Sequence, residues 1–281
     1  DGGGIITGRG EGELLVAGQI CFIPAGWEHE FRVLRRSRLS TALEARGFLA
    51  AAIRRGASPR ADDPAWTDSW VEAGRVTALR HAAVLEAADE PTGPAVARAV
   101  VAALPTGARL FVGSSNSARD LDLGVGEWPE DLDVVASRGL AGIDGCVSTA
   151  VGLALADPGR PWVALVGDLT FLHDIGALLV GPGEPRPADL TIVVANDSGG
   201  GIFSLLEQGD ERFATHFERV FGTPHHADLA ALCAGYGIAY AAPEIGELPG
   251  LLAGGAGGVR VLEVRTSRRG LRERHRRIGG R

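Results

Sequence analysis

Carboxylate and amide side chains follow two apolar segments of the chain at a spacing that could hold a metal ion. Asp168 ends the run "VALVGD", and Asn196 and Asp197 end the run "LTIVVAND", 28 and 29 residues later. A strand–helix–strand unit takes about 30 residues, so we expect these oxygens at one carboxyl edge of a parallel sheet, where open α/β sheets bind ligands. Hard oxygen ligands in that place suit Mg²⁺ or Mn²⁺, and Mg²⁺ keeps phosphate oxygens among its ligands.

Three glycines, Gly199 to Gly201, follow the second of these segments. They let the backbone approach a ligand closely and can supply a carbonyl oxygen to a metal or N–H groups to a phosphate. A bound cation would also offset the repulsion between a diphosphate and the carboxylates of Asp168 and Asp197. A lone Gly-Asp pair at a strand end is more often a helix cap, and a glycine run a plain turn. The combination at this spacing favours a site for a diphosphate and a divalent cation.

Alternating strands and helices must position these residues. The apolar, β-branched run "LTIVVA" is typical of a strand buried on both faces, so we predict an α/β fold with helices on both faces of a parallel sheet. Strands are expected at 109–113, 133–136, 163–167, 190–196 and 259–264. Helices are expected at 70–88, 93–103, 145–156, 174–179 and 228–236, and the Arg-rich end from Arg265 to Arg281 is expected to be a solvated helix face.

The motifs around these residues carry a resemblance. The chain has "GDLTFLHD", then "NDSGGGIF", preceded by "SRGLAGIDGCVSTAVGLALA" and "VGSSNSARD" and followed by "EQGDERF" and "FGTPHHADLAALC". In this order they resemble the 2-succinyl-5-enolpyruvyl-6-hydroxy-3-cyclohexene-1-carboxylate synthases (MenD family), over residues from about 63 to the C-terminus. These are homo-oligomeric transferases of menaquinone biosynthesis that depend on thiamine diphosphate (ThDP). The resemblance implies that residues 61–281 form a ThDP diphosphate- and Mg²⁺-binding domain, with 61–90 as a linker helix region.

The resemblance also implies roles for individual residues. Asp168, Asp197 and the Gly199 carbonyl would hold the metal; because the family usually has Asn where this chain has Asp197, Asn196 is the alternative ligand. Ile143 matches the residue that props ThDP in its bent conformation, and Ile202, Phe203 and Leu206 match the apolar wall beside its thiazolium ring. The residues expected to bind the cofactor are Ile143, Gly167, Asp168, Leu169, Thr170, Asp197, Gly199, Gly200 and Ile202.

The family's reaction decarboxylates 2-oxoglutarate and adds the succinyl-semialdehyde carbanion to isochorismate. Both substrates are dicarboxylates, which guanidinium groups bind through paired hydrogen bonds. Ser115, Arg119 and Arg138 match polar residues that the family uses around substrate and cofactor, and Phe203 and Leu206 are expected to contact substrate as well. The alternative for the arginines is a surface ion pair. His173 and Asp174 also match the family and are expected to be structural.

No residue of the chain is assigned as catalytic. In the family, a glutamate from a separate pyrimidine-binding domain, in the same or a partner subunit, starts the activation of ThDP. No stretch before Asp63 resembles that domain, so we expect the chain to be an incomplete enzyme that does not turn over alone. Two other functions stay open: another ThDP carboligase or decarboxylase, which Leu169 and "AGIDG" disfavour, and a non-catalytic remnant that binds diphosphates.

Residues 1–60 have a different pattern and are predicted to form a β-rich fragment and a linker. Short alternating segments between glycines fill residues 2–33, and residues 39–55 have helical spacing. "GQICFIPAGWEHEFRV" resembles the second cupin motif through Gly18, Pro24, Gly26 and His29, although Val33 replaces its final Asn. One histidine is too few ligands for a metal site, so a plain strand–turn–strand fragment is favoured.

Composition excludes several classes of protein. The net charge is −7 and the basic residues are dispersed, so nucleic acid is not an expected partner. No apolar run is long enough to span a membrane. Cys21, Cys146 and Cys233 form neither a zinc pattern nor a disulfide framework, which favours buried thiols and a cytoplasmic location.

Overall fold

The computed structural model describes residues 3–8, 11–16, 30–33, 64–129, 131–137 and 140–278. Contacts divide the chain into two units, Asp1–Asp68 and Ser69–Arg281. The described strands of the first unit form an antiparallel sheet in the order β2-β1-β3, with bounds β1 Gly3–Gly8, β2 Glu11–Val16 and β3 Glu30–Val33. Gly18, Pro24, Gly26, His29 and the expected helix at 39–55 lie outside the described residues, so the cupin-like fragment and the division at residue 60 remain predictions.

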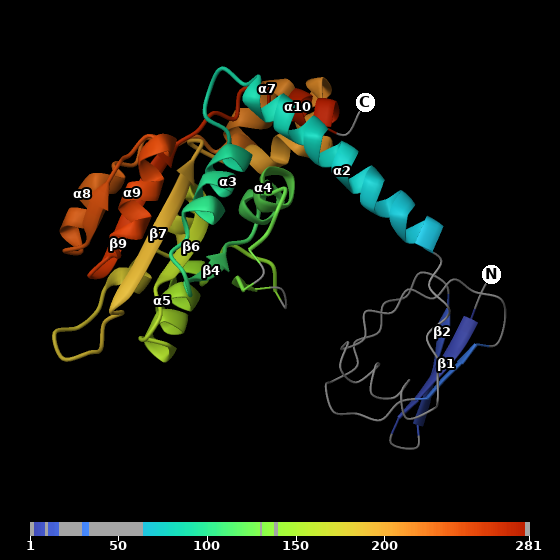
Figure 1. Ribbon diagram of the computed structural model, residues 1–281, viewed down its shortest axis with the longest axis horizontal. Coiled ribbons are helices and arrows are strands. Elements are labelled where there is room, and N and C mark those ends of the chain that lie inside the picture. The colour runs from blue at the N-terminus through green and yellow to red at the C-terminus, as the bar shows by residue number, and fades with distance from the viewer. Residues whose placement is uncertain are drawn as a thin grey trace. The chain divides into compact units, whose positions relative to one another are not determined.

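A six-stranded parallel sheet forms the second unit, and this confirms the predicted α/β fold class (Figure 1). The strand order is β5-β4-β6-β7-β9-β8, so β6 and β7 lie side by side in the middle. The strands are β4 Arg109–Val112, β5 Asp133–Ala136, β6 Trp162–Gly167, β7 Asp189–Asn196, β8 Ala239–Ala241 and β9 Gly258–Arg265. Five of them match the expected strands to within a residue at either end; the short strand β8 was not predicted.

Helices connect these strands. The α-helices are α2 Pro64–Glu86, α3 Gly93–Ala103, α4 Asn116–Gly124, α5 Cys146–Ala156, α6 Asp168–His173, α7 Ala214–Phe217, α8 Leu229–Gly235, α9 Leu248–Ala253 and α10 Leu271–Ile278. Shorter turns are the 3₁₀ segments η1 Ile175–Leu178, η2 Gly201–Leu205, η3 Glu207–Gly209, η4 Glu211–Phe213 and η6 Ile245–Glu247, and the π-helical η5 Glu218–Gly222. Among the described helices, none is both long and apolar enough to cross a membrane.

Residues 174–179 were expected to be the helix after β6, and the structure has the 3₁₀ helix η1 there. The sequence analysis missed α6, which begins directly at Asp168, and also α4, α7 and α9. The chain therefore turns from strand to helix at the predicted metal ligand itself, with no intervening loop. Asp168 occupies the first turn of α6, where a carboxylate is stabilised by the free N–H groups of the helix.

The core lies on both faces of the sheet because side chains of a strand alternate between faces. In β7, Leu190, Ile192 and Val194 pack with helices α5 and α8, whereas Val193 packs with α3, α4 and α9 on the opposite face. Cys146 and Cys233 are buried free thiols in the first of these clusters, as predicted; Cys21 lies outside the described residues. A sheet covered on both faces leaves its carboxyl edge as the place where side chains can meet a ligand.

The contact between α3 and α4 is too close to admit a methyl group. A Cβ atom on Gly124, the last residue of α4, would collide with the carbonyl oxygen of Pro94 in α3. A Cβ on Gly93 would likewise collide with the carboxylate of Asp120. These two glycines therefore set the distance between the helices.

We predict opposite effects for two glycine-to-alanine substitutions. Gly124→Ala should lower the free energy of unfolding by about 1–3 kcal/mol, because neither backbone can move away without disturbing packed side chains. Gly152→Ala in α5, where a Cβ would meet nothing within 4 Å, should raise it by about 0.5–1 kcal/mol. Urea denaturation of both variants measures this. An unchanged or raised stability for Gly124→Ala would contradict the close packing.

Candidate functional site

A cavity of about 250 Å³ lies at the carboxyl edge of the sheet, where β6 and β7 end. It brings together residues that the sequence analysis placed at a cofactor or substrate site. Those that line it are Ser115, Ile143, Gly167, Asp168, Leu169, Thr170, Asp197, Gly199, Gly200, Ile202 and Phe203. Segments that are far apart in the sequence therefore share one cavity.

Asp168 is the most constrained side chain of this cavity, with only 3% of its surface exposed. Its Oδ1 accepts a hydrogen bond from the Leu169 N–H at 2.8 Å, and its Oδ2 accepts one from the Gly199 N–H, also at 2.8 Å. The second bond joins the ends of β6 and β7 directly. The Nε2 of His225 lies 2.9 Å from the same Oδ2.

Asn196 points into the core rather than into the cavity. Its Nδ2 donates to Glu263 Oε1 at 2.8 Å, and its Oδ1 accepts from the Ser198 N–H at 2.8 Å. Glu263, on β9, is 2% exposed and also accepts a hydrogen bond from the Tyr240 hydroxyl. This carboxylate raises the pKa of the half-buried Tyr240, after the larger contribution of burial itself. Both polar ends of Asn196 thus have protein partners that hold the turn after β7.

The glycine turn after β7 is covered by the segment that ends η5. Gly200 N–H donates to the Gly222 carbonyl at 2.8 Å. A Cβ on Gly199 would collide with this carbonyl, and one on Gly200 would collide with that of Phe221. Gly199 also has a φ of 150°, which side-chain-bearing residues rarely adopt. Glycine is therefore required here both by conformation and by the close passage of a second backbone.

Three residues near this cavity have strained backbone conformations. The non-glycine residues with positive φ in the described chain are Ser115 at 75°, Ser198 at 60° and Thr223 at 36°. Ser115 precedes α4, Ser198 lies in the turn after β7, and Thr223 follows η5. Conformations of this kind cost on the order of 1–3 kcal/mol and tend to cluster at ligand sites.

The cavity wall carries polar atoms that fit a polar ligand. Ser114 Oγ and Asn116 Oδ1 are buried and have no hydrogen-bond partner among the described residues, and both side chains line the cavity. Buried polar atoms are almost always satisfied. The Ser114 hydroxyl can donate to an acceptor such as a diphosphate oxygen, whereas the Asn116 Oδ1 can only accept a hydrogen bond from a ligand donor. In the same part of the chain no group of three or more His, Cys, Asp or Glu side chains is arranged to hold a metal ion by itself. Mg²⁺ needs only one or two carboxylates when phosphate oxygens complete its coordination, and the carboxylates of Asp168 and Asp197 both line this cavity.

Negative charge is concentrated in the cavity. Burial and the neighbouring Asp168 raise the pKa of Asp197 to about 7, against the lowering effects of Arg268, the Gly199 N–H and His225. Burial and Asp197 likewise raise the pKa of Asp120, on α4, to about 7. Three aspartates therefore face one small space, and a divalent cation would relieve their repulsion.

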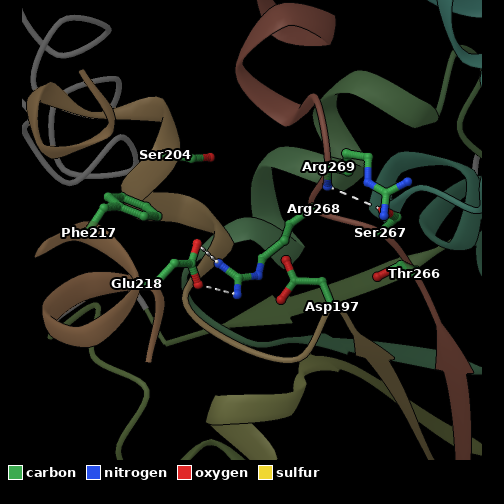
Figure 2. A pocket seen from close by; sticks show the side chains of 8 residues that line it. All are labelled: Asp197, Ser204, Phe217, Glu218, Thr266, Ser267, Arg268 and Arg269. Carbon is green, nitrogen blue, oxygen red and sulfur yellow. Dashed lines mark hydrogen bonds and ion pairs between the residues drawn. The ribbon is translucent and has the colours of Figure 1, made fainter. Parts of the chain in front are cut away.

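A second cavity, of about 360 Å³, adjoins the first and shares Asp197, Thr266 and Ser267 with it. Figure 2 shows the Arg268 guanidinium lying between Glu218 and Asp197. Arg268 binds the Glu218 carboxylate through two hydrogen bonds, of 3.0 Å and 2.7 Å. This pair fixes η5, and with it the Gly222 carbonyl, against the loop after β9.

Some predicted residues are not part of the cavity wall. Arg119 turns back along α4, where its Nη1 donates to the Ser115 carbonyl at 2.7 Å, and Leu206 is 44% exposed. The Leu206 carbonyl instead accepts a hydrogen bond from Arg272 of α10. Arg138 lies outside the described residues. The substrate roles of all three remain predictions.

His173 and Asp174, which were expected to be structural, hold neighbouring segments. His173 pairs with Asp144 at 3.1 Å, and Asp174 accepts hydrogen bonds from the backbone N–H and the hydroxyl of Ser148. The Asp174 bonds attach the start of α5 to the end of α6.

Sequence reasoning missed several residues of the site. Asp120, Ser114 and Asn116 lie next to the motif residue Ser115, and His225 lies in "FGTPHH", but none was assigned a role. Arg268 and Glu218 come from segments without a recognisable motif. The one available signal for Asp120, Ser114 and Asn116 was their place in the motif "VGSSNSARD".

Comparisons with known proteins find relatives of the second unit. Residues 127–254 match the model of the thiamine pyrophosphate enzyme C-terminal TPP binding domain. A 2-succinyl-5-enolpyruvyl-6-hydroxy-3-cyclohexene-1-carboxylate synthase of Nocardia farcinica is 61% identical over 186 residues, which are 66% of this chain and 34% of the relative. The synthase of the same name from Rhodococcus erythropolis is 55% identical over 216 residues, 76% of this chain and 40% of the relative.

The chain thus spans about a third to two fifths of the length of the curated relatives that it matches. An X-ray structure from Mycobacterium smegmatis, provisionally described as a thiamin diphosphate-dependent enzyme, aligns with a TM-score of 0.47 and 24% identity over 63% of this chain and 32% of that one. The resemblance drawn from the motifs is confirmed: the C-terminal part of this chain is homologous to these synthases and carries a ThDP-binding domain.

We predict that Asn196 stabilises the metal-free chain and that Asp197 does not. Asn196→Ala leaves the buried Glu263 without its amide donor and should cost about 1–3 kcal/mol, a loss of about 2–4 °C in Tm for each kcal/mol. Asp197→Asn removes a charge that Asp168 repels, so the Tm should stay equal or rise. Thermal unfolding in EDTA measures both. If Asn196→Ala leaves the Tm unchanged but abolishes Mg²⁺ binding, Asn196 is a ligand instead.

We also predict that Asp120 makes the metal-free chain less stable as the pH rises. Its pKa is raised to about 7 in the folded chain, so between about pH 4 and 7 the folded state holds a proton that the unfolded state has lost. The contribution of Asp120 to the free energy of unfolding is therefore largest below about pH 4 and is lost as the pH rises to about 7. Asp120→Asn should therefore gain Tm relative to the wild type at pH 8 and not at pH 5. The exposed Asp122→Asn on the same helix is the control, and an equal difference at both pH values would contradict the raised pKa.

Proposed function

We propose that the cavity holds ThDP with a divalent cation, Mg²⁺ or Mn²⁺, bound by the Asp168 and Asp197 carboxylates and the Gly199 carbonyl. The observation that supports this most strongly is the Asp168–Gly199 hydrogen bond of 2.8 Å, which brings the acidic end of β6 against the glycine turn after β7. Two strand ends, a helix N-terminus and a turn of glycines then surround one point. These groups would suit a divalent cation together with a diphosphate.

Asp197 is a better candidate ligand than Asn196 because it lines the cavity, whereas the two polar ends of Asn196 bind Glu263 and Ser198. The raised pKa of Asp197, about 7 without a metal, indicates a carboxylate that lacks a compensating charge. A cation would supply that charge and hold the side chain ionised.

The apolar part of the cavity suits the rings of the cofactor. Ile143, Ile202 and Phe203 line it, and the Phe203 ring packs at 5.5 Å from that of Phe221. ThDP supplies a carbon nucleophile at its thiazolium ring and stabilises the carbanion that follows decarboxylation. Ile202 and Phe203 would exclude water from the position beside that ring.

We further propose that the chain is the cofactor-binding part of a cytoplasmic, homo-oligomeric transferase of menaquinone biosynthesis that joins 2-oxoglutarate and isochorismate. The identity of 61% and 55% to synthases of that name supports this proposal. A glutamate that activates ThDP would come from a pyrimidine-binding domain outside the described residues. Arg119, and Arg138 beyond the described part of the chain, would then bind substrate carboxylates, with Ser115 and Leu206 beside them.

Calorimetry tests the cofactor site. The chain should bind ThDP only when Mg²⁺ is present, and Asp168→Ala should weaken this binding by 100-fold or more, because one of two metal carboxylates is lost while a neighbouring negative charge remains. Asp122→Ala, on the exposed face of α4, should bind like the wild type. Binding of ThDP without Mg²⁺, or binding of ADP as tight as that of ThDP, would overturn the assignment.

A hybrid of this chain with the rest of the Nocardia farcinica relative tests the reaction. It should release CO₂ from 2-oxoglutarate when isochorismate is present, and it should not turn over pyruvate. Turnover of pyruvate would identify a different ThDP carboligase, and Mg²⁺-dependent ThDP binding without any turnover would identify a binding module.

A further inference from the structure

We propose that His225 is a positioning residue for the metal site: its Nε2–H occupies one oxygen of the Asp168 carboxylate, so that Asp168 presents a single oxygen, Oδ1, to the cation. The proposal rests on the cation site of the proposed function and adds to it a residue from a separate loop. The imidazole Nε2 lies 2.9 Å from Asp168 Oδ2, and the His225 side chain is largely buried, with 16% exposed.

The direction of this hydrogen bond follows from the other ring nitrogen. His225 Nδ1 accepts a hydrogen bond from the Ala227 N–H at 3.3 Å, so in the neutral ring the hydrogen sits on Nε2. Nε2 therefore donates to Asp168 and has no lone pair for a metal. His225 acts on the site through Asp168 rather than as a ligand.

The hydrogen bonds to Asp168 leave one lone-pair position of its carboxylate free. A carboxylate has about four lone-pair positions, and three are occupied: Leu169 N–H donates to Oδ1, while Gly199 N–H and His225 Nε2–H donate to Oδ2. The remaining position is on Oδ1. Asp168 can then bind a cation through one oxygen only. Single-oxygen binding fits the small octahedral shell of Mg²⁺, whereas binding through both oxygens is common for the larger Ca²⁺.

The loop that carries His225 is held at both ends, which keeps the imidazole in place. Before it, the Gly222 carbonyl accepts the Gly200 N–H, and Arg268 holds Glu218. After it, the Asp228 carboxylate accepts the Ala231 N–H and caps α8. Between these anchors Thr223 has the unusual φ of 36°. The strained turn places His225 beside Asp168, which is 57 residues earlier in the chain.

Three variants of the full chain test the proposal. Titration calorimetry with MgCl₂, and separately with CaCl₂, is run with ThDP in excess in both cell and syringe on the wild type, His225→Ala and His225→Gln. The exposed neighbour His226→Ala is the matched control. His225→Ala should bind Mg²⁺ about 10–100-fold more weakly. Its Ca²⁺ affinity should fall less, because the freed Oδ2 allows both oxygens to bind. His225→Gln, which can donate an N–H near the position of Nε2, should recover most of the preference for Mg²⁺, and His226→Ala should match the wild type.

The outcomes separate this proposal from the function on which it rests. If the wild type binds Mg²⁺ and His225→Ala binds it equally well, His225 does not position Asp168 and the cofactor site stands. Equal losses for Mg²⁺ and Ca²⁺, together with a lower Tm, would show a purely structural residue and also overturn the proposal. If the wild type shows no Mg²⁺-dependent ThDP binding, the cofactor site itself is wrong.

Discussion

The site depends on one carboxylate that three segments of the chain bind at once. Asp168 accepts N–H groups from its own helix, from the glycine turn after β7 and from the loop before α8. Because this carboxylate is buried, the N–H donors take the place of the water that would otherwise hydrate it. The same hydrogen bonds hold α6, the glycine turn after β7 and the loop before α8 in place around the carboxylate. The geometry of the edge of the sheet is thus set by satisfying one buried charge.

The neighbouring carboxylates are less well compensated. Asp197 and Asp120 face the same cavity, and for each burial is the larger cause of a raised pKa and a neighbouring aspartate the second. The Arg268 guanidinium, which lowers the pKa of Asp197, already forms two hydrogen bonds with Glu218. The folded chain therefore stores electrostatic repulsion at the site, and a bound cation would release it. The repulsion makes the metal-free chain less stable and would increase its affinity for a cation; such a trade between stability and function is typical of functional sites.

Spacing in the sequence was enough to predict the parallel sheet, its central strands and the shared position of Asp168 and Asp197, because a strand–helix–strand unit has a nearly fixed length. The apolar runs located five strands to within a residue. Spacing could not place Asn196, whose amide turns to Glu263 of β9 through a contact 67 residues away in the chain. Nor could it find His225, since the loop 223–228 follows no periodic segment. Contacts made by irregular backbone depend on tertiary packing that local patterns do not encode.

The segment from η5 to the start of α8, residues 218–228, has a kinetic consequence. It closes over the glycine turn through the Gly200–Gly222 hydrogen bond and reaches Asp168 through His225, yet it belongs to neither core cluster. Segments with few apolar contacts open at a much lower free energy than a buried sheet does. Opening of this segment would break the His225–Asp168 and Gly200–Gly222 hydrogen bonds, so these two contacts should open at the rate of the segment and not at the rate at which the whole domain unfolds. The Gly200 amide hydrogen, which is bonded to the Gly222 carbonyl, should therefore exchange with solvent through opening of this segment.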